Sequence, residues 1–363
     1  MNLKPIELLI RKHNNYPDWY FYIPMGINIF SSDWCPVGCS NCGVNAKTNV
    51  KDETRISKER ILKILDQAHE LRIPTYMLTY LVGSEPFIRL VELCDIIKRY
   101  QQKMDGCKLN TSALTFTSFK KAKAQLKMLK NNGWTNILYI IPNLSISLGM
   151  QQVANNIPVP FENIINGILA FKDIFSQNEA TLLITHYIIN NTFNEYPEIL
   201  MNKYKDISGE DLDVRIKTSK ITLAGRAKKT ISTKAEDKIR EKECFRPDVG
   251  SYINPLLNIT LRGEYRMCTF FGMHTGIQKN NIYTVPIDEK IHKINNDPFF
   301  GFIVLCGGLP KLYEEALNFN QSIKNKLAEN VHQVCKILYD EYEENVRFRA
   351  VVDKCVFDKI GVN

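Results

Sequence analysis

Short apolar runs alternate with amphipathic stretches between residues 20 and 221, and this alternation limits the possible folds more than any other feature. The runs have the length of strands, and the stretches between them repeat apolar residues with helical periodicity. Strands that alternate with helices predict a parallel sheet, because parallel neighbours need a crossover between them. The predicted strands are Met25–Phe30, Thr75–Val82, Lys108–Leu114, Ile137–Leu148, Ala180–Ile189 and Asp213–Ile221.

The segments between these strands carry helix signals. Ser57 stands just ahead of the apolar positions Ile61, Ile64 and Leu65, as an N-cap residue does. Six strands suit an open six-strand barrel, in which chemistry takes place where the strands end. The predicted helices are Ser57–Leu71, Phe87–Gln102, Phe119–Asn131, Pro160–Ile174 and Glu195–Lys203.

A domain boundary is predicted near residue 230, because the sequence from Arg215 to Lys242 is basic and polar. This stretch is either a solvated linker or a binding patch for an acidic peptide or phosphate. The fold class is therefore α/β, a partial (β/α)6 barrel with a smaller C-terminal α+β domain. Residues 1–20 form an N-terminal extension, 21–230 the barrel, and 231–363 the second domain, which holds a hairpin (Leu256–Thr260 with Glu264–Cys268) and helices from Lys311 to Asn345.

Composition adds few constraints. The chain has 363 residues, 44% of them hydrophobic and 24% charged, which is ordinary for a folded protein. Its net charge of +8 is too diffuse to name an anionic partner, so nucleic acid is not favoured. The N-terminus has no signal-peptide pattern and no apolar run is long enough to span a membrane, so we expect a cytoplasmic protein.

Ten cysteines in a cytoplasmic chain point to metal or catalytic roles rather than disulfides. Cys35, Cys39 and Cys42 fall within eight residues, directly after the first predicted strand. Three thiolates on a four-iron cluster leave one iron open to a substrate. Zinc would need a fourth ligand, and no second C-x2-C occurs. Cys94 and Cys107, which lie within or beside predicted barrel helices, are interpreted as buried thiols.

The C-x3-C-x2-C spacing and its position resemble the radical S-adenosylmethionine superfamily. The resemblance covers about residues 20–230 and implies a 4Fe-4S cluster on these cysteines, with S-adenosylmethionine as cosubstrate. Asn41 stands where the family usually has an aromatic residue near adenine.

Further segments resemble the family's S-adenosylmethionine contacts. Gly83, Ser84, Glu85 and Pro86 follow the second predicted strand and look like the Gly-Gly-Glu-Pro element that binds the amino group, although a plain strand-to-helix turn gives the same pattern. The resemblance also implies a ribose contact at Ser147, preferred over Ser145, and a contact at Arg226 within a Gly-Arg-Ala segment.

Cys244 precedes the predicted hairpin and Cys268 follows its turn, an arrangement that resembles the first half of the SPASM and twitch auxiliary-cluster domains. No C-x2-C-x5-C-x3-C follows, so the resemblance implies one auxiliary cluster. Its ligands would be Cys244, Cys268, Cys306 and either Cys335 or Cys355; the alternative is ordinary core cysteines.

The resemblance implies that an electron from a reductant such as flavodoxin or ferredoxin cleaves S-adenosylmethionine, and that the resulting 5'-deoxyadenosyl radical abstracts a substrate hydrogen. Auxiliary domains of this kind favour a ribosomally made peptide as substrate, modified by thioether or carbon-carbon crosslinking, epimerisation or oxidation. The alternatives are a small-molecule alcohol dehydrogenase and a non-enzymatic iron-sulfur electron carrier or metal-dependent nucleic-acid binder. No catalytic triad, phosphate-binding loop or dinucleotide fingerprint is present.

Overall fold

The computed structural model describes most of the residues of the chain. They are 4–24, 26–40, 42, 46–73, 85–101, 107–136, 141–149, 156–188, 195–220, 256–261, 263–266, 285–330 and 334–361. The chain divides into two compact units. The terminal unit comprises Met1–Ile27, Gln67–Ile73 and Ser232–Asn363, and the sheet unit comprises Asn28–Asp66 and Pro74–Ile231.

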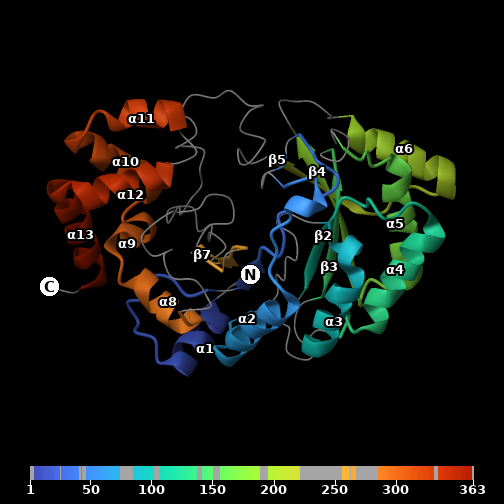
Figure 1. The fold of residues 1–363 in the computed structure, drawn as a ribbon, viewed down its shortest axis with the longest axis horizontal. Helices are drawn as coiled ribbons and strands as arrows, with labels where there is room; N and C mark the ends of the chain where they lie inside the picture. Colours follow the sequence, from blue (N-terminus) through green and yellow to red (C-terminus); the bar gives the residue numbers. More distant parts are fainter. Residues whose placement is uncertain are drawn as a thin grey trace. The chain divides into compact units, whose positions relative to one another are not determined.

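The described part of the sheet unit contains four parallel strands in the order of the sequence (Figure 1). A helix follows each of the first three strands before the next begins, so each connection is a crossover. This arrangement confirms the predicted α/β class with a parallel sheet. The strands are β2 (Lys108–Thr111), β3 (Asn143–Leu148), β4 (Thr181–Ile188) and β5 (Arg215–Lys220).

Helices α3 to α6 lie along one face of this sheet (Figure 1). Ser118 caps α4, because its hydroxyl accepts the backbone N–H of Lys121. The elements are η1 (Val50–Asp52), α2 (Lys58–Glu70), η2 (Pro86–Arg89), α3 (Leu90–Tyr100), α4 (Phe119–Asn131), α5 (Phe161–Ile174) and α6 (Tyr196–Ser208).

The helix-covered face of the sheet is apolar, and Leu109, Leu144, Ile146 and Ile184 on it are fully buried. Gly167 of α5 permits the close packing here, because a Cβ at this position would lie 3.1 Å from Cδ1 of Ile146 and 2.6 Å from the ring of Phe116. The parallel register therefore places one set of side chains in the core and the alternate set on the other face.

That other face is polar, and we call it the polar face. The Asn143 amide donates to the Thr181 hydroxyl at 2.8 Å, and the hydroxyls of Ser145 and Thr185 are hydrogen-bonded at 2.7 Å. These contacts show that the alternate residues of β3 and β4 point to one side. By register, the polar face comprises Lys108, Asn110, Asn143, Ser145, Ser147, Thr181, Leu183, Thr185, Arg215 and Lys217.

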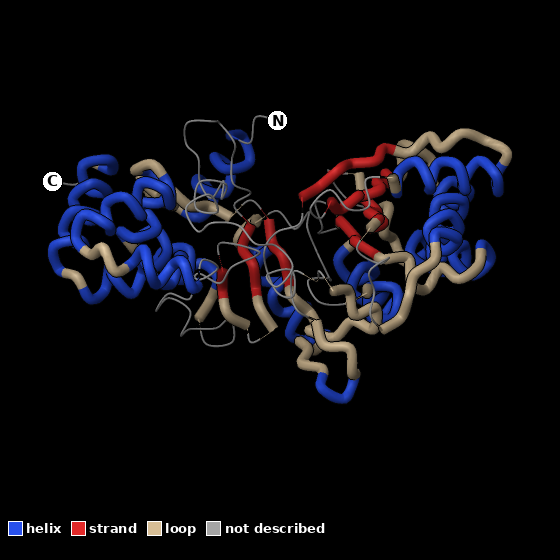
Figure 2. The backbone as a smooth tube through the Cα atoms, turned by 90° about the horizontal axis from the view of Figure 1, so that it is seen from above, coloured by secondary structure: helices blue, strands red, loops and turns tan. Residues whose placement is uncertain are grey.

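The terminal unit is mainly helical towards the C-terminus (Figure 2). Among its described residues, three strands form a sheet in the order β1-β6-β7, with β1 beginning in this unit. Asn295 holds the N-terminal segment, since it accepts the Tyr22 N–H at 2.8 Å and donates to the Tyr22 carbonyl at 2.7 Å. The elements are α1 (Lys4–Asn14), β1 (Gly26–Ile29), β6 (Leu256–Ile259), β7 (Tyr265–Arg266), α8 (Ile287–Asn295), α9 (Pro298–Leu305), α10 (Gly308–Phe319), α11 (Ile323–Asn330), α12 (Val334–Glu344) and α13 (Val346–Ile360).

Most predicted elements agree with the described structure. The helices α2 to α5 match their predicted segments closely, and the predicted hairpin is confirmed by antiparallel pairing of Ile259 with Tyr265. Gly263 makes its turn with a φ of 76°, a conformation that suits glycine. The predicted second strand, residues 75–82, lies outside the described residues.

Three features differ from prediction. Residues 26–29 form a strand as expected, but it pairs in the β1-β6-β7 sheet and not with β2 to β5. Its apolar run identifies a strand without identifying a partner distant in sequence. Helices α1, α8, α9 and α13 were not predicted, and α6 continues five residues past the predicted end, Lys203, to Ser208. Among the helices described, none combines the length and the apolar character that a membrane crossing requires.

Candidate functional site

The loop that carries Cys35, Cys39 and Cys42 is closed at its base by backbone pairing. The Cys35 N–H donates to the Lys47 carbonyl at 2.8 Å, and the Lys47 N–H donates to the Asp33 carbonyl at 2.6 Å. Further along, the Asp33 N–H bonds to the Thr54 carbonyl at 3.1 Å. The segment entering the loop is thus paired with the segment leaving it. This pairing fixes the two ends of the loop that carries the three thiols.

Contacts inside the loop hold its shape. The Cys42 N–H donates to the Cys39 carbonyl at 3.2 Å, which makes a turn between two of the thiols. The Ala46 N–H lies 3.4 Å from Sγ of Cys42 and donates to it. All three thiols are half-buried. The loop therefore holds its sulfur atoms partly shielded from solvent.

A segment beyond β3 clamps the loop from outside. The Asn156 amide donates to the Pro36 carbonyl at 2.8 Å. Gly38 has a φ of 66°, and a Cβ there would lie 2.8 Å from Cγ2 of Thr48 and 3.0 Å from Cβ of Asn156. Glycine is thus required at position 38 by both conformation and space. The clamp ties the cysteine loop to the segment that follows β3.

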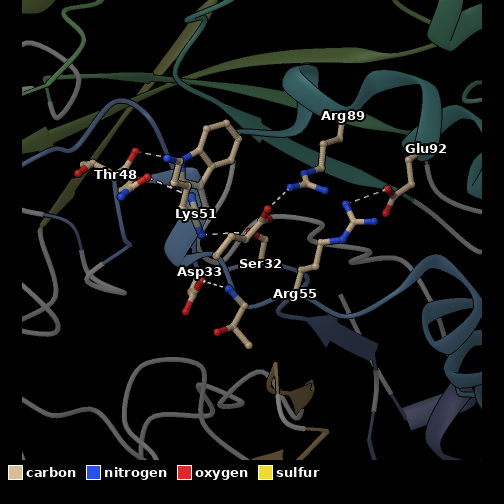
Figure 3. Close-up of polar contacts among 11 residues, drawn as sticks. Ser32, Asp33, Thr48, Lys51, Arg55, Arg89 and Glu92 are labelled. Atoms are coloured by element: carbon tan, nitrogen blue, oxygen red, sulfur yellow. Dashed lines mark hydrogen bonds and ion pairs between the residues drawn. The ribbon is translucent and has the colours of Figure 1, made fainter.

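Polar side chains brace the entry to the loop (Figure 3). Oγ of Ser32 accepts the Trp34 N–H at 3.0 Å and donates to Glu53 at 2.5 Å. The other carboxylate oxygen of Glu53 is paired with the Arg89 guanidinium. Arg55 pairs with Glu92 nearby, at 3.5 Å. Two charge pairs therefore join the returning segment of the loop to η2 and α3.

Glu85, directly before η2, is 3% exposed and accepts three hydrogen bonds. The donors are the Thr111 hydroxyl, and the Ser112 N–H and hydroxyl at 2.8 and 2.6 Å. Burial raises the pKa of Glu85, and these hydrogen bonds oppose the rise. Burial also raises the pKa of the Cys35 thiol to about 12, with the negative charge of Glu85 as the next cause, so Glu85 and Cys35 lie within electrostatic reach of each other.

The described residues contain no group of three or more His, Cys, Asp or Glu side chains close enough to hold a single metal ion. Each thiolate of a four-iron cluster binds a different iron, so a cluster spaces its ligands more widely than one ion does. None of the described cysteines is joined in a disulfide. Three thiols on one closed loop are thus the donor set present at this site, and thiolate is the donor that iron-sulfur clusters use.

Other predicted site residues fall in several places. Pro86 is buried at the start of η2, and Ser147 lies half-buried on the polar face near the end of β3. Gly83, Ser84, Arg226, Cys244 and Cys268 lie outside the described residues, as does Asn41. Thr111, Ser112 and Asn156 were not predicted as site residues. Their position at the end of a strand could have identified Thr111 and Ser112. They were placed inside a predicted strand, and that strand ends earlier than predicted.

The cysteines of the terminal unit are described in part. Cys306 follows the last residue of α9, and its thiol is hydrogen-bonded with that of Cys355 on α13. Burial and then this contact raise the pKa of Cys306 to about 12. Cys335 is buried in the helical core. The thiols of Cys306 and Cys355 are therefore adjacent, whereas the ligand set predicted for an auxiliary cluster stays a prediction.

Comparisons with known proteins give little further information. No family model matches the chain, and no curated protein matches it. Among solved structures, the chain is similar to the FeFe-hydrogenase maturase HydG from Carboxydothermus hydrogenoformans, with 13% identity and a TM-score of 0.40 over 98% of this chain and 86% of that one. At this level the similarity supports no inference about activity.

Proposed function

We propose that the chain is a radical S-adenosylmethionine enzyme with a 4Fe-4S cluster on Cys35, Cys39 and Cys42. One observation carries the proposal: a loop closed by backbone pairing presents these three half-buried thiols, and the first of them, Cys35, lies within electrostatic reach of Glu85, which belongs to the predicted S-adenosylmethionine turn. When bound, the cluster would supply the electron that cleaves S-adenosylmethionine and so starts hydrogen abstraction from substrate.

The residues of the chain would position the reactants. The Gly83 and Ser84 backbone would bind the amino group of S-adenosylmethionine, and Ser147 and Arg226 would contact other parts of it. Glu85, held by Thr111 and Ser112, would fix the start of η2 beside that turn. Asn156 and the backbone pairing of Cys35 with Lys47 would keep the ligand loop in one conformation.

The substrate belongs to the proposal and rests on the sequence alone. We propose a ribosomally made peptide, modified at a carbon from which hydrogen is abstracted, with a flavodoxin or ferredoxin as reductant. A SPASM- or twitch-like auxiliary cluster on Cys244, Cys268 and Cys306, with Cys335 or Cys355, would support that chemistry.

The test is product formation by an anaerobically reconstituted sample given S-adenosylmethionine and dithionite. The wild-type chain should form 5'-deoxyadenosine, and Cys35→Ala should form none. Cys94→Ala is the matched control, because Cys94 is a buried thiol of α3 away from the loop and should leave product formation in place. Equal amounts of 5'-deoxyadenosine from the wild-type chain and from Cys35→Ala would refute the proposed enzyme activity.

The auxiliary cluster has a separate test. Cys244→Ala and Cys306→Ala should each lower the iron bound per chain while sparing slow cleavage of S-adenosylmethionine without substrate. Cys107→Ala, which changes a buried thiol of the sheet unit, should leave iron content unchanged. If the iron bound per chain is unchanged in Cys244→Ala and Cys306→Ala, the auxiliary cluster is refuted and only the cluster on Cys35, Cys39 and Cys42 is proposed.

A further inference from the structure

The polar face of the sheet carries positive charge without a matching negative charge. Lys108, Arg215 and Lys217 belong to it by register, and no Asp or Glu occupies any of its positions on β2 to β5. The other residues of the face are amides, hydroxyls and Leu183. On the outer surface of the unit, by comparison, some cations are paired with acids, as Lys123 is with Asp173 at 2.8 Å.

Among the described residues, none forms a hydrogen bond or an ion pair with the side chain of Lys108, Arg215 or Lys217. Arg215 and Lys217 are exposed, so hydration alone can satisfy them. Lys108 is half-buried and has lost part of its hydration shell. A desolvated ammonium group without an acid is unfavourable, because burial disfavours the charged form.

The positive charge of Lys217 also acts on Lys108. Burial first, and then the positive charge of Lys217, lower the pKa of Lys108. Two strands separate β2 from β5, so this repulsion acts across the whole described sheet. Charged residues on edge strands often prevent aggregation, and that role explains Arg215 and Lys217 well enough. It does not explain a half-buried lysine placed where a second lysine repels it.

Hydroxyl groups lie beside these cations. Register aligns Ser147 with Thr185, and Thr185 with Lys217. Ser145 and Thr185 are buried and bonded to each other, which leaves each oxygen a further bonding position. Cations together with hydroxyl donors are the groups that bind phosphate and carboxylate oxygens.

We infer that the polar face binds an anionic ligand that presents two negative charges on oxygen, as a phosphate ester or a dicarboxylate does. Lys108 and Lys217 bind the negative charges, Arg215 contributes from the neighbouring register position, and the Thr185 hydroxyl donates to an oxygen of the ligand. The inference rests on the proposed function in one respect: if the chain is that enzyme, this ligand is the charged part of its substrate.

Titration calorimetry on the full-length, cluster-free chain tests the inference without S-adenosylmethionine. The probes are inorganic phosphate and succinate, with succinamide as the neutral analogue, at constant ionic strength. The wild-type chain should bind phosphate or succinate but not succinamide. Tighter binding of one anion assigns the ligand to the phosphate or the carboxylate class, and either result supports the inference.

Lys217→Met should weaken the binding of that anion by at least about tenfold, since a charge-assisted hydrogen bond contributes this much. Lys217→Glu should abolish it, and Arg215→Met should weaken it less. The matched control is Lys127→Met, which removes the same charge from an exposed position of α4. An equal loss in Lys127→Met, or no anion binding by the wild-type chain at about 10 mM, would overturn the inference.

Cys35→Ala separates this inference from the proposed function. The variant should bind the anion as the wild-type chain does, although it forms no 5'-deoxyadenosine. If the wild-type chain binds the anion but does not cleave S-adenosylmethionine, the inference is supported and the proposed enzyme activity is refuted. Cleavage by a chain that binds no anion would refute the inference alone.

Discussion

Ser112 donates both its backbone N–H and its hydroxyl to the same oxygen of Glu85, at 2.8 and 2.6 Å. Both bonds form in the sheet unit, directly after β2, and Glu85 itself is 3% exposed. A buried carboxylate that receives two donors from one residue depends on that residue for its position.

We predict that Ser112→Ala lowers the free energy of unfolding by about 1–3 kcal/mol, because a hydroxyl bonded to a buried acid is lost. Urea titration measures the change. In a Glu85→Ala background the same Ser112 change should cost little, since its acceptor is already gone. Equal costs in both backgrounds would show that the hydroxyl does not act through Glu85.

Gly38→Ala should destabilise the sheet unit by about 2 kcal/mol or more, because the new Cβ adds a close contact to an unfavourable φ. Gly209→Ala is the matched control: Gly209 has a similar φ of 75°, and nothing lies within 4 Å of its added Cβ. Thermal unfolding should show the larger loss for Gly38→Ala. The prediction is wrong if the two alanines cost the same.

Asn156→Ala should weaken retention of iron by a reconstituted sample, because the amide bond from Asn156 to Pro36 holds the ligand loop. The measurement is the rate of iron loss to a chelator. Asn166→Ala removes a similar amide bond, to the Phe116 carbonyl at 3.1 Å, away from the loop, and should leave the rate unchanged. Equal rates for wild type and Asn156→Ala would show that this clamp does not govern iron retention.

The Glu53–Arg89 pair should show a coupling energy of about 1–3 kcal/mol in a double-mutant cycle with Glu53→Gln and Arg89→Met. Both side chains are largely buried, at 9% and 18% exposure, so removing one leaves the other poorly hydrated. The exposed pair of Arg99 and Asp66, 3.9 Å apart, should couple by less than about 0.5 kcal/mol. Coupling as weak as in this exposed pair would mean that Glu53 and Arg89 are well hydrated.

The raised pKa of Asp297 predicts that the stability of the terminal unit depends on pH. Burial raises its pKa from 3.8 to about 6, although the Phe299 N–H donates to it at 3.0 Å. A carboxyl with a raised pKa in the folded state favours the protonated form, so stability falls as pH rises from 3.8 through about 6.

Asp297→Asn keeps a good N-cap without the charge. Relative to the wild-type chain, this variant should gain about 1–3 kcal/mol between pH 4 and pH 7. Asp206→Asn, at an exposed position of α6, should show no such gain in urea titrations over the same range. A pH-independent difference for Asp297→Asn would contradict the prediction.

The sequence predicted the sheet unit well where one periodicity dominated. The helices α2 to α5 repeat apolar residues with helical periodicity, and α3, α4, α5 and α6 alternate with the strands β2 to β5 along the chain. The cysteine loop was located from its spacing. Its closure was not, because the pairing of Cys35 with Lys47 and the clamp from Asn156 depend on backbone contacts across gaps in sequence.

The partner of β1 escaped prediction for a similar reason. An apolar strand can add to any sheet edge. The partner of β1, β6, begins at residue 256, and the sequence between them does not indicate which sheet edge lies beside β1. Glu85 was singled out as part of a turn, but its donors on Thr111 and Ser112 come from a strand whose end was placed three residues too late.

The paired base of the cysteine loop also has a thermodynamic consequence. Bringing the ends of a loop together costs conformational entropy. In this loop the backbone hydrogen bonds among Asp33, Cys35, Lys47 and Thr54 offset that cost when the unit folds. A ligand that bridges the thiols would then order only the side chains and the few bonds between them. Affinity for such a ligand should therefore follow the folding stability of this unit, and conditions that loosen the base should release the ligand before the unit unfolds.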